Sequence, residues 1–334
     1  MLSSAVRTFT DPDAYHAARP HAHAEGVITG RGEFRAKTTT IRFDRLSLER
    51  CEESLPKTTY SAVNPAVFGV LFATSPDEQI HFNGLALTPD RMIVFRRGSE
   101  GHKRSSGASQ WGAIALSHDD AAAAGSTING RELLAPPSTH VVKPPPLLLS
   151  ELVNLHQAAA RLAQGAPDIL ASPEVTRAIE QALTRVLVLC LSEGQAIKVG
   201  GAHWRHAAVL RRLEDFLEEN CNRPLYTAEL CAAAAVSDRT LRDLCHEHLG
   251  MGPGRYLWLR RMHMARRALR TADLACATVT EIATNYGFWE LGRFAVTYRS
   301  LFGESPSATL RRPPEDPRPQ EIASSPWQLP EPAS

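Results

Sequence analysis

The sequence predicts an α+β chain, with a β-rich N-terminal domain and two helices, then an all-α C-terminal domain with two helix-turn-helix units joined by a long helix. Three observations support this prediction. Short apolar runs alternate with turn residues up to about residue 135, which is typical of a small barrel or sandwich. Apolar stripes at helical spacing follow between 147 and 192. One turn-and-helix pattern then occurs twice, at 235–253 and at 285–306.

The length of 334 residues favours two domains. We expect a mobile N-terminus over 1–30, which includes an Ala/Pro-rich stretch. The β-rich domain and its helix pair cover 31–195, a linker with two glycines near its end covers 196–202, and the all-α domain covers 203–312. The segment 313–334 is rich in proline, serine and glutamate, so we expect it to be disordered.

Six candidate strands lie in the first half, each bounded by turn residues. They are Glu33–Ile41, Leu46–Cys51, Ala66–Ala73, Ile80–Leu87, Arg91–Phe95 and Trp111–Leu116. The run Phe68–Ala73 is apolar and has the length of a buried strand, while Asn83 and Gly84 are typical of a hairpin turn. Strands of this number and spacing favour a small barrel or sandwich.

Two prolines at 136–137 and three at 144–146 mark the end of the β-rich part. Two helices are predicted next, from Leu147 to about Gln164 and from Pro173 to about Ser192. Each carries one apolar stripe that must be buried. The sequence leaves open whether these stripes pack on the β-rich part of the same chain or on a second subunit.

The segment 285–306 reads as a turn, a helix and a new helix start. Gly287 supplies a positive φ at little steric cost, and Gly303 ends the helix that begins near Glu290. Phe294, Tyr298 and Leu301 fall at i, i+4 and i+7, so they form one apolar face. A serine and a proline at 305–306 then start a final helix.

The earlier segment 235–253 has the same layout. Ser237 can cap its helix, and Gly250 can end it. Its buried positions are Leu241, Leu244 and Leu249. Ala235 stands at the turn, where a left-handed conformation costs an alanine on the order of 1 kcal/mol.

A long helix from Pro253 to about Thr271 lies between the two copies. At 1.5 Å per residue it spans roughly 27 Å, so it can hold two helices about one DNA turn, roughly 34 Å, apart. Trp258 and Met262 belong to its apolar stripe. We expect most of its arginines to be solvated, namely Arg260, Arg261, Arg266, Arg267 and Arg270.

Residues from about Leu210 to Arg312 resemble the DNA-binding domain of the AraC/XylS family of bacterial transcription regulators, and they make up about a third of the chain. The resemblance is carried by both copies and by the helix between them. Its residues are Leu230, Ala232, Val236, Ser237, Arg239, Thr240, Leu241, Leu249, Gly250, Pro253, Tyr256, Leu257, Arg261, Ala265, Leu269, Ile282, Ala283, Gly287, Phe288, Phe294, Phe302, Gly303, Ser305 and Pro306.

The resemblance implies that the second helix of each unit enters the major groove of double-stranded DNA. The residues that we expect on the DNA-facing surface are Ser237, Arg239, Thr240, Arg242, Asp243, His246, Leu291, Gly292, Arg293, Val296 and Arg299. Arginine can donate two hydrogen bonds to guanine O6 and N7, and aspartate can accept a hydrogen bond from the cytosine amine. Asp243 and Val296 depart from the family, which often has arginine there, although Val296 could pack on a thymine methyl group. The alternative for each arginine is an ordinary solvated side chain.

The resemblance also implies a cupin-like sensor domain ahead of the all-α domain, a small-molecule effector, a homodimer and an activating contact with RNA polymerase. Two other functions stay open. One is a cupin-type metal-binding enzyme fused to a DNA-binding module. The other is a dimeric DNA-binding protein that responds to no ligand.

The net charge of +1 hides an uneven distribution of arginine. Residues 251–312 contain ten arginines and four acidic residues, whereas 203–250 contain six arginines and eight acidic residues. Neither segment contains lysine. We therefore expect the second unit and the long helix to supply most of the electrostatic attraction to DNA.

The remaining chemistry-bearing residues indicate no enzyme. The six cysteines, which we expect as buried thiols, form no CxxC pair. His21 and His23 lack a suitably spaced glutamate, so we predict surface or mobile histidines, no metal site and no cofactor. We find no nucleophile–base pair or phosphate-binding loop. Without a signal peptide or long apolar run, we expect a cytoplasmic protein with no membrane contact.

Overall fold

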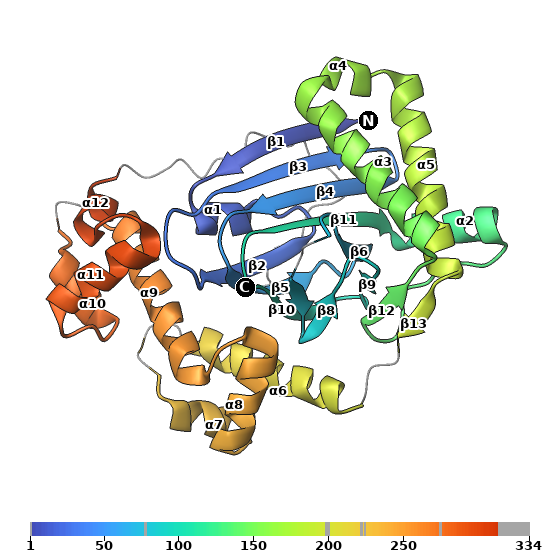
Figure 1. The fold of residues 1–334 in the computed structure, drawn as a ribbon. Coiled ribbons are helices and arrows are strands. Elements are labelled where there is room, and N and C mark those ends of the chain that lie inside the picture. Colours follow the sequence, from blue (N-terminus) through green and yellow to red (C-terminus); the bar gives the residue numbers. More distant parts are fainter. Residues whose placement is uncertain are drawn as a thin grey trace.

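Figure 1 shows the computed structural model, which has a β-rich N-terminal part and a helical C-terminal part. The residues that it describes are 2–76, 79–197, 201–220, 223, 225–273 and 276–312. Within them, every helix falls short of the length or hydropathy that a membrane-spanning helix needs.

The described N-terminal residues form two antiparallel sheets. The eight-stranded sheet has the order β1 (Ser3–Phe9), β3 (Ala36–Arg42), β4 (Leu46–Glu53), β11 (Ser109–Ser117), β6 (Val67–Ala73), β9 (Met92–Val94), β12 (His140–Lys143) and β13 (Gln195–Ile197). The five-stranded sheet has the order β2 (Ala22–Ile28), β5 (Lys57–Val63), β10 (Glu100–Ser105), β7 (Ile80–Phe82) and β8 (Leu85–Leu87).

The large sheet buries both of its faces, because successive side chains of a strand point to opposite sides. Leu71 of β6 packs in a core with Ile28 and Phe82 of the small sheet. Its neighbour Phe72 packs in a second core with helices beyond the large sheet. These helices are α2 (His118–Asn129), α3 (Pro146–Gly165), α4 (Pro167–Leu170) and α5 (Pro173–Ser192).

The predicted helix pair corresponds to α3 and α5, and its apolar stripes pack on the chain's own large sheet. Leu152 and Leu183 are fully buried in the core that contains Phe72. Of the two alternatives that the sequence left open, packing within one chain therefore accounts for these stripes.

Residues 2–30 are ordered, so the prediction of a mobile segment is wrong for them. β1 pairs with β3 along its whole length, and β2 pairs with β5. Between them lies α1 (Pro12–Ala17), which begins at Asp11 and buries Tyr15 completely. Backbone pairing at a sheet edge and one buried aromatic ring hold this segment in place, despite its low apolar content.

The sequence-based strand prediction identified the apolar strands and missed the polar ones. β3, β4, β6, β9 and β11 lie within or overlap the predicted runs, and the run at 80–87 is the hairpin of β7 and β8. Asn83 and Gly84 take φ of 49° and 82° at its turn. β5 and β10 were missed because they bury Lys57 and Lys103 instead of apolar side chains.

The helical part begins at Gly201, and its helices share one core. Its helices are α6 (Gly201–Glu219), α7 (Thr227–Ala234), α8 (Asp238–Leu249), α9 (Pro253–Thr271), α10 (Val279–Asn285), α11 (Leu291–Phe302) and α12 (Pro306–Arg311). The predicted linker 196–202 is shorter than expected, because β13 extends to Ile197 and α6 starts at Gly201. The predicted tail 313–334 lies outside the described residues.

The helical part packs closely on the small sheet (Figure 1). The Ile28 amide of β2 donates a hydrogen bond to His263 Nε2 of α9 at 2.9 Å. The Thr58 hydroxyl of β5 donates to the Leu249 carbonyl at 3.1 Å. His102 Nε2 of β10 lies 2.9 Å from Glu214 Oε1 of α6. Both parts therefore form one continuous body with buried polar contacts.

Most α9 arginines are paired with carboxylates, so the prediction that they are solvated is wrong. Arg266 is 4% exposed and lies 2.5 Å from Asp11. Arg270 also contacts Asp11, Arg267 contacts Asp13 at 2.7 Å, and Arg260 contacts Glu214 at 3.1 Å. The pairs with Asp11 and Asp13 follow from the packing of α9 on the N-terminal segment and the pair with Glu214 from its packing on α6, neither of which sequence periodicity could reveal.

Some thiols and histidines also differ from expectation. Cys51, Cys190 and Cys245 are buried, but Cys276 is exposed. His102 is buried, because it lies between β10 and α6. His21 is partly buried and bonded to Ser47, since the N-terminal segment in which it lies is part of the folded domain.

Candidate nucleic-acid interface

The first predicted contact set lies on α8 and the cap in front of it. Ser237 begins α8, and its hydroxyl accepts a hydrogen bond from the Thr240 amide at 3.2 Å. Leu241 and Leu244 face the core. The predicted contact residues are all exposed, and they are Ser237, Arg239, Thr240, Arg242, Asp243 and His246.

Arg242 is partly neutralised on the helix surface, because it forms an i,i+4 ion pair with Asp238 at 2.7 Å. Both side chains are at least half exposed, so the pair adds little stability and can open for another anion. Arg239 has no carboxylate partner among the described residues. It is therefore the more available cation of α8.

The second predicted set lies on α11. Phe294, Tyr298 and Leu301 are buried, as the sequence predicts. The opposite side is exposed and carries the predicted contact residues Leu291, Gly292, Arg293, Val296 and Arg299. No atom lies within 4 Å of the position that a Cβ at Gly292 would occupy, so the surface of α11 is accessible at this position.

Arg293 projects from this surface with 81% of its side chain exposed and lies 3.8 Å from Glu290. The neighbouring apolar side chains Val296 and Trp289 are 72% and 77% exposed. Sequence reasoning missed Trp289, although its position at the start of a predicted DNA-contacting helix was a usable signal. An arginine flanked by exposed apolar groups can combine a guanine fork with contacts to thymine methyl groups.

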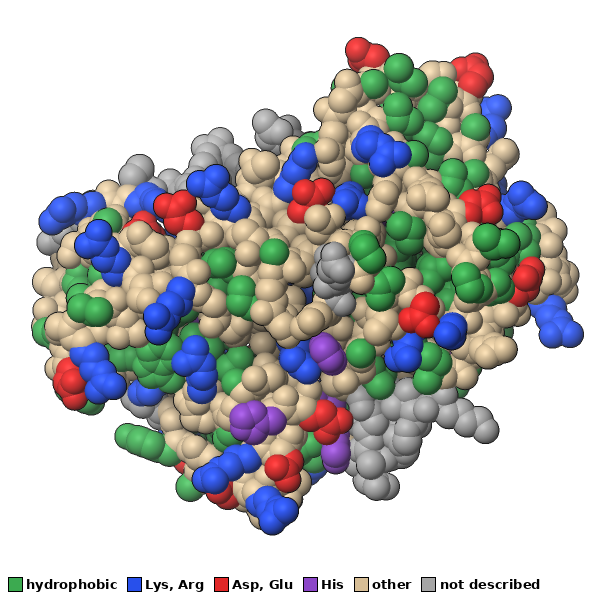
Figure 2. All heavy atoms as spheres, viewed as in Figure 1, with side chains coloured by type: hydrophobic (Ala, Val, Ile, Leu, Met, Phe, Trp, Pro, Cys, Tyr) green, Lys and Arg blue, Asp and Glu red, His purple; other side chains and the backbone are tan. Residues whose placement is uncertain are grey.

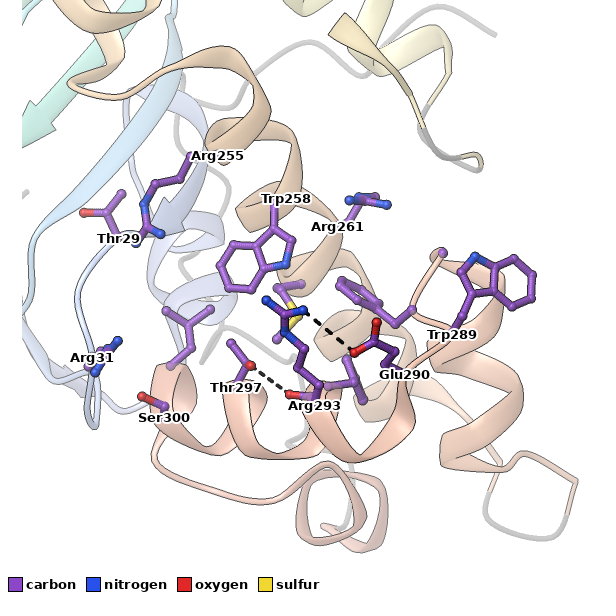
Figure 3. Close-up of a pocket in the computed structure, with 15 residues that line it drawn as sticks. Thr29, Arg31, Arg255, Trp258, Arg261, Trp289, Glu290, Arg293, Thr297 and Ser300 are labelled. Atoms are coloured by element: carbon purple, nitrogen blue, oxygen red, sulfur yellow. Dashed lines mark hydrogen bonds and ion pairs between the residues drawn. The ribbon is translucent and has the colours of Figure 1, made fainter.

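A groove of about 560 Å³ lies between α9, α11 and the β2–β3 connection. Figure 3 shows Arg31, Arg255, Arg261 and Arg293 around it, with Trp258 on its wall. Trp258, which the sequence placed in the core, is only partly buried and faces this groove. Arg31 and Arg255 were also absent from the predicted contact set. Arg31 carries no local sequence signal, since packing alone brings it beside α11.

Pairing with carboxylates changes where positive charge is available. Arg260, Arg266, Arg267 and Arg270 are held by carboxylates, so the long helix contributes less free charge than its composition indicates. Figure 2 shows arginine side chains over the visible face of the helical part. The arginines of the helical part that line the groove or extend from the exposed helices are Arg239, Arg242, Arg255, Arg261, Arg293 and Arg299.

A second site, a small cavity of about 80 Å³, lies between the two sheets. Lys57 Nζ is 2.6 Å from Glu53, and Lys103 Nζ is 3.5 Å from the same carboxylate. Lys103 also lies 3.7 Å from the centroid of the Trp111 ring. Burial lowers the pKa of Lys103 to about 7, with Glu53 opposing that shift. This cavity combines an aromatic wall with buried cations.

Three side chains of the helical part could hold a metal ion. They are His206 of α6 and Glu247 and His248 of α8, whose ligand atoms lie within 4.8 Å of one another. His206 Nδ1 is 3.1 Å from Glu247 Oε2, so an ordinary hydrogen bond already accounts for the closest approach. Within the described residues, no such three-residue group lies between the two sheets.

Comparison with known proteins places the helical part in a family. Residues 230–312 match the model of a helix-turn-helix domain. The chain is 42% identical over 101 residues to a XylDLEGF operon transcriptional activator of Pseudomonas putida, which covers 30% of this chain and 32% of that protein. It is 35% identical over 163 residues to a probable thc operon regulatory protein of Rhodococcus erythropolis, covering 46% and 48% of the two chains.

A solved structure of a probable AraC family transcriptional regulator from Rhodopseudomonas palustris is 32% identical, and the match covers 31% of this chain and 95% of that chain with a TM-score of 0.28. The chain spans about a third of the length of the first Pseudomonas relatives and about half of the Rhodococcus relative. Residues 230–312 are thus a helix-turn-helix domain similar to the DNA-binding domains of transcription regulators of the AraC/XylS type.

Proposed function

We propose that this protein is a sequence-specific DNA-binding regulator that activates transcription in response to a small molecule. The observation that carries the proposal is the pair of exposed helices, α8 and α11, on either side of α9. With 19 residues, α9 spans roughly 27 Å, which suits helices that enter successive major grooves. Such a regulator acts where the bacterial chromosome lies, so we propose a cytoplasmic location.

The proposed roles follow from side-chain chemistry. Arg239 and Arg293 would each read a guanine, and Val296 would pack on a thymine methyl group. Ser237 would contact phosphate together with the free amides at the start of α8. Arg242, Asp243 and the other exposed residues of the two helices would complete the surface.

The test uses the full chain and DNA from upstream of its own gene and neighbouring operons. We expect a footprint with two contact regions about one helical turn apart. Arg293→Ala should weaken specific binding by about 1–3 kcal/mol and relax one base preference. Arg185→Ala is the control. Arg185 lies on α5 and not in the predicted DNA-contact set, so this variant should bind DNA with the affinity of the parent. A chain that is folded but protects no DNA segment would sink the proposal.

The small-molecule response is proposed from the cavity between the sheets. Its lysines and Trp111 suit a small ligand with an aromatic ring or an anionic group. A ligand that binds there would raise thermal stability by mass action and would shift DNA affinity only if it prefers one arrangement of the domains. The test measures the Tm of the parent and of Lys103→Met while candidate metabolites are added. If no metabolite raises Tm in either protein, a ligand-independent regulator is favoured.

The remaining parts of the proposal come from the family. We propose that the two facing sheets form a cupin-like domain, that the domain boundary lies in the segment 196–202, that the protein is a homodimer, and that it makes an activating contact with RNA polymerase. Analytical ultracentrifugation and in vitro transcription with purified polymerase test the last two. No metal-ligand cluster of the described residues lies between the sheets, so no observation favours the alternative metalloenzyme.

A further inference from the structure

We propose that the β-rich domain itself binds DNA, through Arg31, and that Arg31, Arg255 and Arg261 form a cationic groove for the phosphate backbone between the two major-groove contacts. This inference rests on the proposed function and extends it. It makes the N-terminal domain a part of the DNA-binding surface, in addition to any sensing role.

Arg31 is held against the helical part by contacts on both sides of it. Three residues before it, the Ile28 amide donates to His263 Nε2 of α9 at 2.9 Å. Two residues after it, Glu33 lies beside the end of α11, where its Cγ is 3.0 Å from the position that a Gly303 side chain would occupy. The β2–β3 connection therefore bridges α9 and α11, and Arg31 reaches the groove between them (Figure 3).

Arg255 and Arg261 lie on the same face of α9, with Trp258 between them. The Arg255 guanidinium carbon lies 5.9 Å from the Trp258 ring centroid, and that of Arg261 lies 5.5 Å from the Phe288 ring centroid. Aromatic contacts of this kind orient a guanidinium without neutralising it. Both guanidinium groups thus stay available for an anion.

The groove arginines differ from the other arginines of α9. Arg260, Arg266, Arg267 and Arg270 each contact a carboxylate. Among the described residues, no carboxylate forms an ion pair with Arg31, Arg255 or Arg261. Arg261 Nε is buried and has no hydrogen-bond partner there, which leaves a donor to be satisfied. Glu290, the acidic residue of the groove lining, lies next to Arg293.

DNA is the anion that this position fits. When α8 and α11 occupy successive major grooves, the phosphate strands of the intervening minor groove must pass along α9. The groove opens on the same side as Arg293, the predicted base-reading residue of α11. Unpaired arginines beside that path would bind phosphate oxygens in a bidentate manner and release counterions.

The experiment measures DNA affinity of the full chain over a series of salt concentrations. Arg31→Ala should weaken binding to specific and non-specific DNA by the same factor, on the order of tenfold at low salt. It should also reduce the steepness of the plot of log K against log salt concentration by about 0.9, because one phosphate contact is lost. The triple variant with Arg255→Ala and Arg261→Ala should lower that slope by about 2.7.

Arg35→Ala is the matched control. Arg35 lies on the same connection and is 74% exposed, but it pairs with Glu33 and does not line the groove. It should leave both affinity and slope unchanged. Thermal unfolding of each variant confirms an intact fold, and Arg31→Lys should restore most of the slope.

The outcomes separate this inference from the proposed function. If the parent binds its operator and Arg31→Ala keeps the full salt slope, the inference is wrong and the regulator assignment stands. If Arg31→Ala changes one base preference alone, phosphate binding is also excluded. If the folded parent binds no DNA, the proposed function itself fails.

Discussion

Ala235 carries the tightest backbone constraint of the first helix-turn-helix unit. It ends α7 with φ of 55° and ψ of 44°, in the left-handed region. The equivalent turn of the second unit uses Gly287, with φ of 77°. The left-handed conformation that the sequence predicted for Ala235 is confirmed, and an alanine side chain pays a steric penalty there.

Ala235→Gly should therefore raise the free energy of unfolding, by up to about 1 kcal/mol. Urea unfolding at equilibrium measures the change. Gly130→Ala is the opposite variant: its φ is 71° and no atom would contact the added methyl group, so it should lower stability by a similar amount. A loss of stability in Ala235→Gly would show that unfolded-state entropy outweighs the strain.

At the scale of elements, α9 serves two surfaces at once. One side carries Arg266 and Arg267, which pair with Asp11 and Asp13 and fix the helical part to the N-terminal segment. The other side carries Arg255 and Arg261 and faces the groove. The orientation of α9 relative to the sheets thus decides which of its arginines can meet DNA.

Asp11→Asn should destabilise the docked arrangement by about 3 kcal/mol, because it leaves the buried Arg266 without its nearest counter-charge. Asparagine can still cap α1, so the helix start is preserved. The double variant with Arg266→Leu should be less destabilised than the sum of the single variants. Urea unfolding of the four proteins measures this coupling.

Glu33→Gln is the control for these variants. Glu33 pairs with Arg35, and both side chains are more than 70% exposed. Its effect should be close to zero. Additive effects of Asp11→Asn and Arg266→Leu would contradict a coupled pair.

At the scale of the whole molecule, two buried neutral histidines, one between the two parts and one inside the N-terminal part, make stability depend on pH. His263 accepts the Ile28 amide across the boundary, and burial lowers its pKa to about 3. His156 of α3 bonds the Glu49 carbonyl of β4, and burial lowers its pKa to about 3 as well. Both stay neutral in the folded chain under ordinary conditions.

As pH falls below about 6.5, the unfolded chain binds protons at these histidines and the folded chain does not until about pH 3. Stability should therefore be complete above pH 6.5 and should fall by about 1.4 kcal/mol per pH unit for each histidine below it. Urea unfolding from pH 7 to 5 measures the slope. His263→Gln should reduce it by one histidine's share, and an unchanged slope in that variant would contradict the assignment.

Local patterns in the sequence were sufficient for the helices of the C-terminal part. The apolar spacing of Phe294, Tyr298 and Leu301, the cap at Ser237 and the glycine at 303 each act over a few residues, so one chain segment contains all the information. The predicted DNA-facing residues are exposed for the same reason, because helical periodicity separates them from the buried face.

The N-terminal part was harder to predict, for physical reasons. β5 and β10 bury lysines against Glu53, so their inward positions look solvent-exposed in the sequence. The first 30 residues lack an apolar pattern, and their order comes from pairing with strands that follow later in the chain. Such long-range pairing leaves no local signal.

By itself, the sequence determined the family of the C-terminal domain, the two exposed helices and the left-handed turn at Ala235, because each depends on neighbouring residues. Only the tertiary structure decided which arginines remain free. Asp11 and Asp13 lie more than 250 residues from Arg266 and Arg267, yet they neutralise them, while Arg31 arrives beside α11 from the opposite end of the chain. Charge pairing depends on distance in space, which composition and periodicity do not encode.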